Sequence, residues 1–347
     1  MIRVGLIGFG MAGQLFHAPF IRAVDGLQLD CILERSGSLA QQKYPDVFVA
    51  RTMEEFLARD TQLCVVATPN TSHFPLGKQC LLAGRHVVID KPFVTNTKDG
   101  AEIIQLSEKQ SRLLAVYQNR RWDGDFKTVR KVLASGVLGE MVSYISHFDR
   151  FRTYVKENAW RERPEPGSGI LFDLGTHLLD QAITCFGEPL AVSADVFTER
   201  KGGAVDDAFD VRLEYSGMRA NLRSSMIACV PGPRFKLLGT KGSFVKYGMD
   251  PQEDILKKGT APAGAGWGED AEANWGTLTF PDGDSRRTEK VKTEPGDYRG
   301  FYENVRDAIL GKAPLAVPAT GALHAIRAVE LARQSSKERR AIAWSDF

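Results

Sequence analysis

The first 118 residues alternate short apolar runs with segments of helical periodicity. The apolar runs lie at residues 2–7, 27–33, 63–67, 86–89 and 113–116. Because apolar runs flanked by helices are typical of parallel strands covered on both faces, the pattern predicts a doubly wound sheet. Thr52, with Glu55 three residues later, predicts a capped helix start, and Gly84 predicts the end of the helix before residue 86.

After about residue 140, apolar positions alternate with polar ones. The alternation is clearest at 209–215, and similar stretches lie at 142–151, 190–198, 220–228, 234–238 and 243–247. Alternation of this kind predicts antiparallel strands with one buried face, and hence an open sheet with helices on one side. The Gly-, Ala- and Pro-rich stretch 259–272 predicts a surface loop, and helices are expected at 298–310 and 320–336.

These two patterns predict an α/β protein of two domains. We expect an N-terminal doubly wound Rossmann domain at residues 1–120, which binds a dinucleotide. Residues 121–347 are expected to form a C-terminal α+β domain with a large open, mainly antiparallel sheet, for substrate binding and oligomerisation, whose C-terminal helices pack back. Because one face of that sheet would lack helical cover, we expect a homodimer or homotetramer.

Composition narrows the possible partners and the compartment. Lys and Arg number 45 against 43 Asp and Glu, and no basic run is long enough to indicate binding to nucleic acid or to a membrane. The five cysteines lie far apart, without the spacing of zinc or redox motifs, and are expected to be reduced thiols. The absence of a signal-like start and of a long apolar stretch leads us to expect a soluble cytoplasmic protein.

A glycine-rich turn follows the first predicted strand and precedes a helix. Gly8, Gly10 and Gly13 form a G-x-G-x-x-G pattern at the start of a βαβ unit. Gly8 permits the tight turn, Gly10 lets the backbone approach a pyrophosphate, and Gly13 allows close packing of helix and strand. The pattern predicts a dinucleotide site. Its contacts are expected from Gly8, Phe9, Gly10, Met11, Ala12 and Gly13.

The residues at the end of the second predicted strand, where the ribose of the cofactor would bind, favour different cofactors. Glu34 would accept a hydrogen bond from a ribose 2′-hydroxyl and favour NAD, whereas Arg35 and Ser36 would bind a 2′-phosphate and favour NADP. A solvated surface pair is the other interpretation of these charges. The residues themselves leave the choice open.

Two further strand ends carry candidate ligand contacts, since ligands bind at the carboxyl ends of strands in open α/β sheets. The expected cofactor contacts there are Thr68, Pro69, Asn70, His73, Asp90 and Lys91. Lys91, fixed before a proline, is placed to hydrogen-bond a substrate hydroxyl or carbonyl oxygen. A solvent-facing lysine is the alternative.

The segment 167–180 contains Asp173, His177 and Asp180 at helical spacing, which would place three titratable groups on one stripe. A solvated helix face explains the same spacing. A carboxylate–imidazole metal site is a third interpretation, but no second cluster of ligands supports it, and we expect no metal.

Taken together, the glycine turn, Thr-Pro-Asn, Lys-Pro and Gly-x-x-x-x-Asp-x-Gly-x-His-x-x-Asp make the chain resemble the Gfo/Idh/MocA oxidoreductases over nearly its whole length. In that family the corresponding lysine, aspartate and histidine line the substrate site near the nicotinamide. The resemblance therefore implies that Lys91, Asp173 and His177 are catalytic. Asp90 stands where the family most often has Glu.

Residues 117–126 and 246–254 resemble a subgroup that contains NADP-dependent scyllo-inositol 2-dehydrogenases, although Gln118 stands where that subgroup commonly has His. The resemblance implies hydride transfer between NAD(P), with NADP slightly favoured, and a cyclic polyol or sugar, foremost scyllo-inositol and scyllo-inosose. Trp160 and Arg161 match a pair that approaches the cofactor in related reductases. Substrate contacts are implied for Asn119, Arg120, Arg161 and Asp180.

Two alternatives stay open beside this function. One is another sugar or anhydrosugar reductase of the same family. The other, from a different class, is a non-catalytic nucleotide-binding sensor.

Overall fold

The structure is a computed structural model that describes residues 1–156 and 162–346, and the chain forms two compact units. The first unit comprises Met1–Trp122, Gln252–Trp267 and Asp297–Leu323, and the second comprises Asp123–Pro251, Gly268–Gly296 and His324–Phe347. The prediction assigned everything beyond residue 120 to one domain, so two segments change unit. Aromatic packing explains the change, because Tyr298 and Tyr302 lie against Phe20 and Tyr117 of the first unit.

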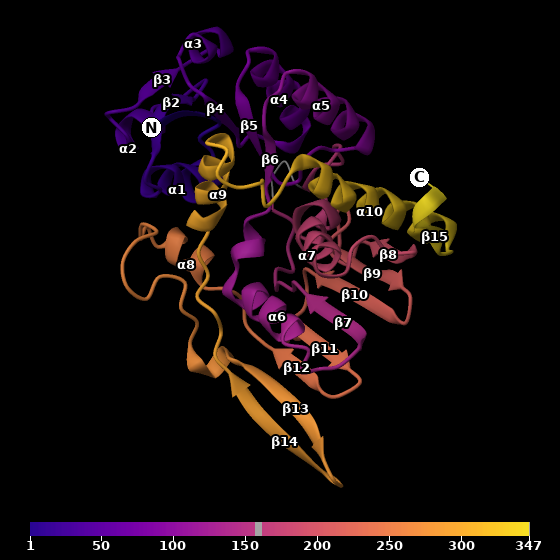
Figure 1. The fold of residues 1–347 in the computed structure, drawn as a ribbon. Helices are drawn as coiled ribbons and strands as arrows, with labels where there is room; N and C mark the ends of the chain where they lie inside the picture. Colours follow the sequence, from indigo (N-terminus) through magenta and orange to yellow (C-terminus); the bar gives the residue numbers. More distant parts are fainter. Residues whose placement is uncertain (157–161, 347) are drawn as a thin grey trace. The chain divides into compact units, whose positions relative to one another are not determined.

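A six-stranded parallel sheet forms the centre of the first unit, in the order β3-β2-β1-β4-β5-β6 (Figure 1). Its strands are β1 (Ile2–Ile7), β2 (Leu27–Leu33), β3 (Phe48–Ala50), β4 (Leu63–Val66), β5 (His86–Asp90) and β6 (Leu114–Tyr117). The predicted Rossmann fold is confirmed. Sequence patterning missed β3, since this strand has three residues and its Phe48 is 44% exposed.

Helices flank this sheet. They are α1 (Ala18–Ala23), α2 (Leu39–Lys43), α3 (Met53–Leu57), α4 (His73–Leu82), α5 (Thr97–Lys109), α8 (Gln252–Lys257) and α9 (Arg299–Ile309). The predicted cap of α3 is confirmed, because Thr52 Oγ1 accepts from the Glu55 N–H at 3.2 Å. The Glu55 carboxylate accepts from the Arg51 N–H at 2.7 Å and not from Thr52, so only half of the predicted capping box forms.

The second unit contains a nine-stranded mixed sheet in the order β14-β13-β12-β11-β7-β10-β9-β8-β15. Its strands are β7 (Met141–His147), β8 (Ala191–Phe197), β9 (Ala208–Tyr215), β10 (Met218–Ser225), β11 (Phe235–Gly239), β12 (Ser243–Lys246), β13 (Gly276–Asp282), β14 (Ser285–Val291) and β15 (Ile342–Ala343). The mainly antiparallel sheet is confirmed, with β7 and β10 as a parallel pair. The prediction missed β13, β14 and β15: β14 is charged and exposed along nearly its whole length, and β15 has two residues.

The helices α6 (Gly124–Ala134) and α7 (Thr176–Phe186) cover the same face of this sheet. Phe126 of α6 packs against Phe235 of β11, and Phe186 of α7 packs against Tyr144 of β7. The last helix, α10 (Ala319–Glu338), begins in the first unit and continues into the second. Within the described ranges, no helix is long and apolar enough to cross a membrane.

The glycine-rich turn joins β1 to a π-helical turn at Gly13–His17. Gly8 has a φ of +95°, in the region that favours glycine, and packs against the end of β4 at Ala67. A Cβ on Gly13 would overlap the Gly8 carbonyl oxygen, whereas a Cβ on Gly10 would meet no atom within 4 Å. The first and third glycines therefore serve packing, and the second leaves an open backbone surface.

We expect Gly13→Ala to lower the free energy of unfolding by about 1–3 kcal/mol, because a backbone clash outweighs the helix propensity that alanine adds. The matched variant Gly10→Ala should change it by less than about 0.5 kcal/mol, since the added methyl meets open space. Urea unfolding of both variants measures the difference. Equal losses would contradict this division of roles.

Candidate active site

At the end of β2, the Glu34 side chain is turned toward the protein. It is 8% exposed, its Oε2 accepts from the Ala40 N–H in the first turn of α2 at 3.3 Å, and it lies 3.7 Å from Arg51 Nη1. The same Arg51 nitrogen donates to the Glu34 carbonyl oxygen at 2.7 Å. Arg35 and Ser36 are exposed. Sequence reasoning missed Arg51, which directly follows the short strand β3 that it also missed.

The loops that follow β4 and β5 are joined by His73. Its ring is fully buried, with Nδ1 2.8 Å from the Pro92 carbonyl oxygen and Nε2 2.9 Å from the Thr68 carbonyl oxygen. Burial lowers the pKa of His73, and the nearby Asp90 and the two carbonyls offset only part of that shift. His73 was predicted as a cofactor contact, but both of its ring nitrogens face backbone oxygens, so the structure gives it the task of holding the two loops together.

At the end of β5, the Asp90 carboxylate accepts from the Lys91 N–H through Oδ1 at 2.7 Å. Its other oxygen lies 3.6 Å from Nε2 of His17. Burial alone would raise the pKa of Asp90, but the contact with His17 and the charges of His17, Lys91 and His73 bring it below its ordinary value. Asp90 is therefore a carboxylate at neutral pH.

In the second unit, the helix that carries the predicted stripe begins at a cap supplied by Asp206. The Asp206 carbonyl accepts from the Ile170 N–H and its Oδ2 from the Leu171 N–H, both at 2.8 Å, while Oδ1 accepts from Arg333 at 2.9 Å. Burial raises the pKa of Asp206, and these donors offset only part of the shift. The helix start is thus satisfied by a side chain distant in sequence.

The first turn of this helix, Leu171–Gly175, is π-helical, and α7 continues from Thr176. The predicted regular α-helical stripe is therefore wrong for the turn that contains Asp173. Single π-helical turns inside α-helices occur frequently at functional sites. His177 and Asp180 are only 3% and 4% exposed, which excludes a solvated helix face. In the part of the chain that the structure describes, no three His, Cys, Asp or Glu side chains group as metal ligands would.

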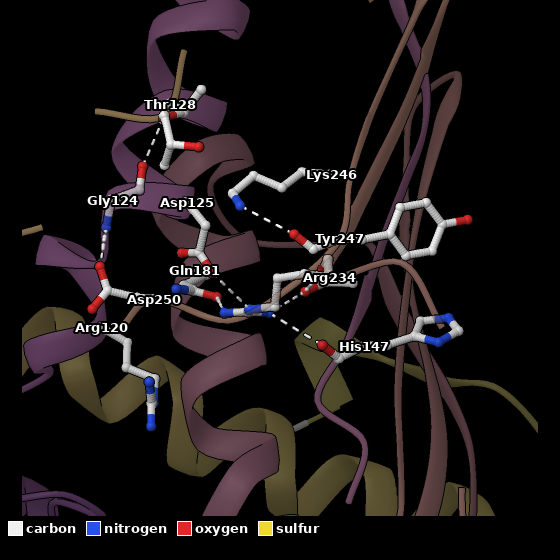
Figure 2. A network of polar contacts seen from close by, with 12 residues as sticks. Arg120, Gly124, Asp125, Thr128, His147, Gln181, Arg234, Lys246, Tyr247 and Asp250 are labelled. Carbon is white, nitrogen blue, oxygen red and sulfur yellow. Dashed lines mark hydrogen bonds and ion pairs between the residues drawn. The ribbon is translucent and has the colours of Figure 1, made fainter. Parts of the chain in front are cut away.

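A buried arginine supports α7 (Figure 2). Arg234 is 2% exposed and donates to Gln181 Oε1 of α7 at 2.9 Å, to Asp125 Oδ2 of α6 at 3.2 Å and to Ser146 Oγ of β7 at 2.7 Å. Its guanidinium lies 4.2 Å from the centre of the Phe235 ring. Because Gln181 directly follows Asp180, this network fixes the helix that presents Asp180 and His177. Nothing in the sequence pattern distinguished Arg234 from a surface arginine.

The two subgroup segments, 117–126 and 246–254, contact each other inside each unit. In the first unit, Arg120 Nη2 pairs with Glu253 Oε2 at 2.5 Å, and the arginine is 6% exposed. In the second unit, Asp250 Oδ2 accepts from the Gly124 N–H at the start of α6 at 2.7 Å (Figure 2). Arg120, which was expected to contact substrate, thus has one of its guanidinium nitrogens paired with Glu253.

Lys246 and Gln252 of the second segment are also internal. Lys246 Nζ is fully buried and donates to Asp270 Oδ2 at 2.7 Å and to the Asn274 carbonyl at 2.8 Å. Gln252 Oε1 accepts from the Tyr298 N–H at 2.9 Å. These residues of the segment therefore hold loops together within their own units.

The remaining predicted residues are placed as follows. Asn119 is 6% exposed at the end of β6, and Thr68 Oγ1 accepts from Ser72 Oγ at 2.7 Å. Trp160 and Arg161 lie outside the described residues. The neighbouring Glu162 pairs with Arg200 at 2.8 Å, and Arg200 also binds Asp207 at 2.8 Å.

The comparisons with known proteins agree with this architecture. Residues 2–118 match the family model described as "Oxidoreductase family, NAD-binding Rossmann fold", and residues 130–344 match "Oxidoreductase family, C-terminal alpha/beta domain", both of the GFO_IDH_MocA group. The chain is 42% identical over 339 residues to an uncharacterised oxidoreductase, YdgJ, of Escherichia coli, with 97% of each chain covered.

A curated relative and a solved structure from Bacillus subtilis are also similar over nearly the whole chain. The scyllo-inositol 2-dehydrogenase (NADP⁺) IolW is 35% identical over 342 residues, covering 98% of this chain and 95% of that protein. The solved structure of the oxidoreductase YvaA superposes with a TM-score of 0.95 at 35% identity, covering 99% and 98% of the two chains. The chain therefore belongs to the Gfo/Idh/MocA family and is an NAD(P)-dependent oxidoreductase.

Proposed function

We propose that the protein is an NADP-dependent dehydrogenase of a cyclic polyol, interconverting scyllo-inositol and scyllo-inosose. The observation that carries the proposal is the burial of His177 and Asp180 on a helix held by Arg234, since buried titratable groups of this kind are suited to proton transfer in a water-poor site. The 35% identical IolW, named as a scyllo-inositol 2-dehydrogenase, supports the choice of substrate.

The glycine turn fits a dinucleotide. A side chain at Gly10 would fill the open space through which a pyrophosphate can approach the backbone, and the helical turn that follows directs N–H groups toward an anion. The residues that would hold the cofactor in the first unit are Gly8 to Gly13, Arg35, Ser36, Thr68, Pro69, Asn70, Asp90 and Lys91. When bound, NAD(P) accepts or supplies the hydride.

The proposed preference for NADP rests on how Glu34 is used. Its carboxylate caps α2 through the Ala40 N–H and lies beside Arg51, which offsets its charge. Repulsion of a 2′-phosphate is thereby reduced, while the exposed Arg35 and Ser36 can bind that phosphate with charge-assisted hydrogen bonds. The structural use of Glu34 thus weighs against its alternative use as a ribose contact.

The proposed proton transfer uses Lys91, Asp173 and His177. In the oxidative direction, His177 takes the proton of the reacting hydroxyl, because a neutral imidazole can accept a proton. Lys91 donates a hydrogen bond to the same oxygen, and Asp173 orients the pair. Asp180, Asn119 and Arg161 are proposed to bind the other hydroxyls. Reduction uses the same groups in reverse.

The active form is proposed to be a homodimer or homotetramer. The sheet face opposite α6 and α7 carries half-buried apolar side chains, among them Ile145 and Leu238, beside the exposed Arg212 and Arg223. A second copy would cover these apolar positions and pair the charges around them.

Initial rates over scyllo-inositol, myo-inositol, glucose and xylose test the function. We expect selective turnover of scyllo-inositol with NADP⁺ over NAD⁺. In Arg35→Ala, the KM for NADP⁺ should rise about tenfold or more, through loss of a charge-assisted hydrogen bond, while the KM for NAD⁺ stays nearly constant.

The control for this panel is Arg22→Ala, which removes an exposed arginine paired with Asp46 and should leave both KM values unchanged. An equal rise for both cofactors in Arg35→Ala would contradict the proposed preference. No turnover with any polyol, together with intact cofactor binding, would favour the nucleotide sensor.

His177→Ala is expected to lower kcat by about a hundredfold or more, because general-base catalysis is lost. NADPH affinity, measured by calorimetry, should change little, since the ring is assigned to the substrate. His324→Ala is the matched control, because this histidine is 37% exposed and pairs with Glu188. Equal losses of kcat and NADPH affinity in His177→Ala would refute the assignment.

Light scattering at micromolar concentration tests the assembly. We expect two or four times the chain mass of 38.3 kDa, because an uncovered sheet with apolar positions is stabilised by a second copy. A species of monomer mass would contradict the proposed assembly.

A further inference from the structure

A chain of buried polar contacts links the glycine turn to the end of β5 inside the first unit. His17, the last residue of the π-helical turn Gly13–His17, is fully buried. Its Nδ1 lies 2.6 Å from the Tyr302 hydroxyl of α9, and its Nε2 lies 3.6 Å from Asp90 Oδ2. The proposed chemistry assigns no task to His17 or Tyr302, and sequence reasoning singled out neither.

The Asp90 carboxylate can only accept hydrogen bonds, which favours one arrangement of the protons in these contacts. Burial raises the pKa of Tyr302 well above its usual value, so the hydroxyl keeps its proton and can donate a hydrogen bond to Nδ1 of His17. In that tautomer the ring hydrogen lies on Nε2, which faces Asp90. The other oxygen of the Asp90 carboxylate accepts from the Lys91 N–H, so this series of contacts ends at Lys91, the residue proposed to hydrogen-bond the substrate oxygen.

We propose that His17 is a positioning residue, which orients the Asp90 carboxylate and through it the backbone at Lys91. The inference rests on the proposed function for the role of Lys91. Its physical basis is that a largely buried carboxylate needs polar groups close by to offset the cost of burial, and Nε2 of His17 lies 3.6 Å from Oδ2 of Asp90. Since His17 lies four residues after Gly13, the same contact ties the proposed dinucleotide turn to the end of β5.

The charged and titratable groups around Asp90 come from several elements. His17 comes from the turn after Gly13, His73 from α4, and Lys91 directly follows β5. Tyr302 of α9 contacts His17 at Nδ1, and Tyr117 of β6 packs on its ring with the centroids 4.4 Å apart. His73 is committed to two carbonyl oxygens, so it cannot replace His17 as the donor to Asp90.

Two substitutions distinguish the roles of the two ring nitrogens of His17. His17→Gln places an amide nitrogen near the position of Nε2, and so keeps a donor toward Asp90. His17→Asn places its amide near Nδ1, and so keeps only the contact with Tyr302. Both variants lack the imidazole, so its own titration cancels when they are compared.

We expect His17→Gln to keep kcat within about threefold of the wild type and His17→Asn to lose about tenfold to a hundredfold, the cost of a misplaced catalytic group. NADPH affinity should change little in either variant. Tyr302→Phe should lower kcat less than His17→Asn does.

Two readouts need no turnover. The amide NMR signal of Lys91 should shift in His17→Asn and stay near its wild-type position in His17→Gln. The unfolding free energies of the two variants should differ at neutral pH. That difference should disappear as the pH falls below about 4 and through the native pKa of Asp90. A carboxylate whose pKa is lowered by folding stabilises the native state only at a pH above its pKa in the unfolded chain.

Equal kcat, equal Lys91 amide shifts and equal pH dependence of unfolding in His17→Gln and His17→Asn would overturn the inference. Absence of polyol turnover in the wild type would overturn the proposed function instead. In that case the Lys91 amide signal and the unfolding comparison still decide whether His17 positions Asp90.

Discussion

The first unit is governed by the constraint that six parallel strands end at one edge of a sheet. Beyond that edge the loops have no sheet hydrogen bonds, and other groups must hold them. His73 joins the loops after β4 and β5 through two carbonyl oxygens, and Glu34 closes the loop after β2 onto α2. Several side chains at the predicted cofactor edge are thus used by the protein itself, which leaves backbone surface at Gly10 and exposed groups at Arg35 and Ser36 for a ligand.

In the second unit, a buried charge holds the helices and the sheet in place. Arg234 carries its cation into the core, where Asp125 neutralises it and Gln181 and Ser146 each accept a hydrogen bond from it. Removing one partner of such a pair would leave the other buried and uncompensated, which is far more costly than losing an exposed pair. The network therefore requires α6, α7 and β7 to keep one arrangement. That requirement gives α7 the rigidity that the proposed role of His177 in proton transfer needs.

The sequence predicted those features whose physical signal is local. The strands β1 and β2 are continuous apolar runs, and the Thr52 cap lies three residues from its partner. The short edge strand β3 and the charged strand β14 bury too few apolar side chains to produce a hydrophobic pattern in the sequence. The sequence led us to expect C-terminal helices that pack back, but not that segments 252–267 and 297–323 belong to the first unit, because that placement depends on aromatic contacts between residues far apart in the chain.

The candidate site likewise contains residues that local spacing predicts and residues whose role depends on distant partners. Spacing predicted the glycine turn and placed Asp173, His177 and Asp180 on one helix, because these are short motifs, and the family resemblance then favoured a functional site over a solvated helix face. Spacing could not show that Arg120 is paired with Glu253, or that Arg51 stands beside Glu34, because each pair joins segments separated by many residues. A long-range partner decides whether a polar side chain faces a ligand or the protein, and no local pattern contains that information.

Internal contacts also explain why this chain resembles the subgroup of the scyllo-inositol dehydrogenases in two segments. In the segments 117–126 and 246–254, Arg120, Glu253, Asp250 and Lys246 form contacts within their own units. A match in these residues therefore reports the way the loops are assembled, and relatives with different substrates can share it. Discrimination among substrates must arise from side chains that remain available to contact a ligand. The shared motif thus explains the common architecture, and the substrate has to be identified by kinetics.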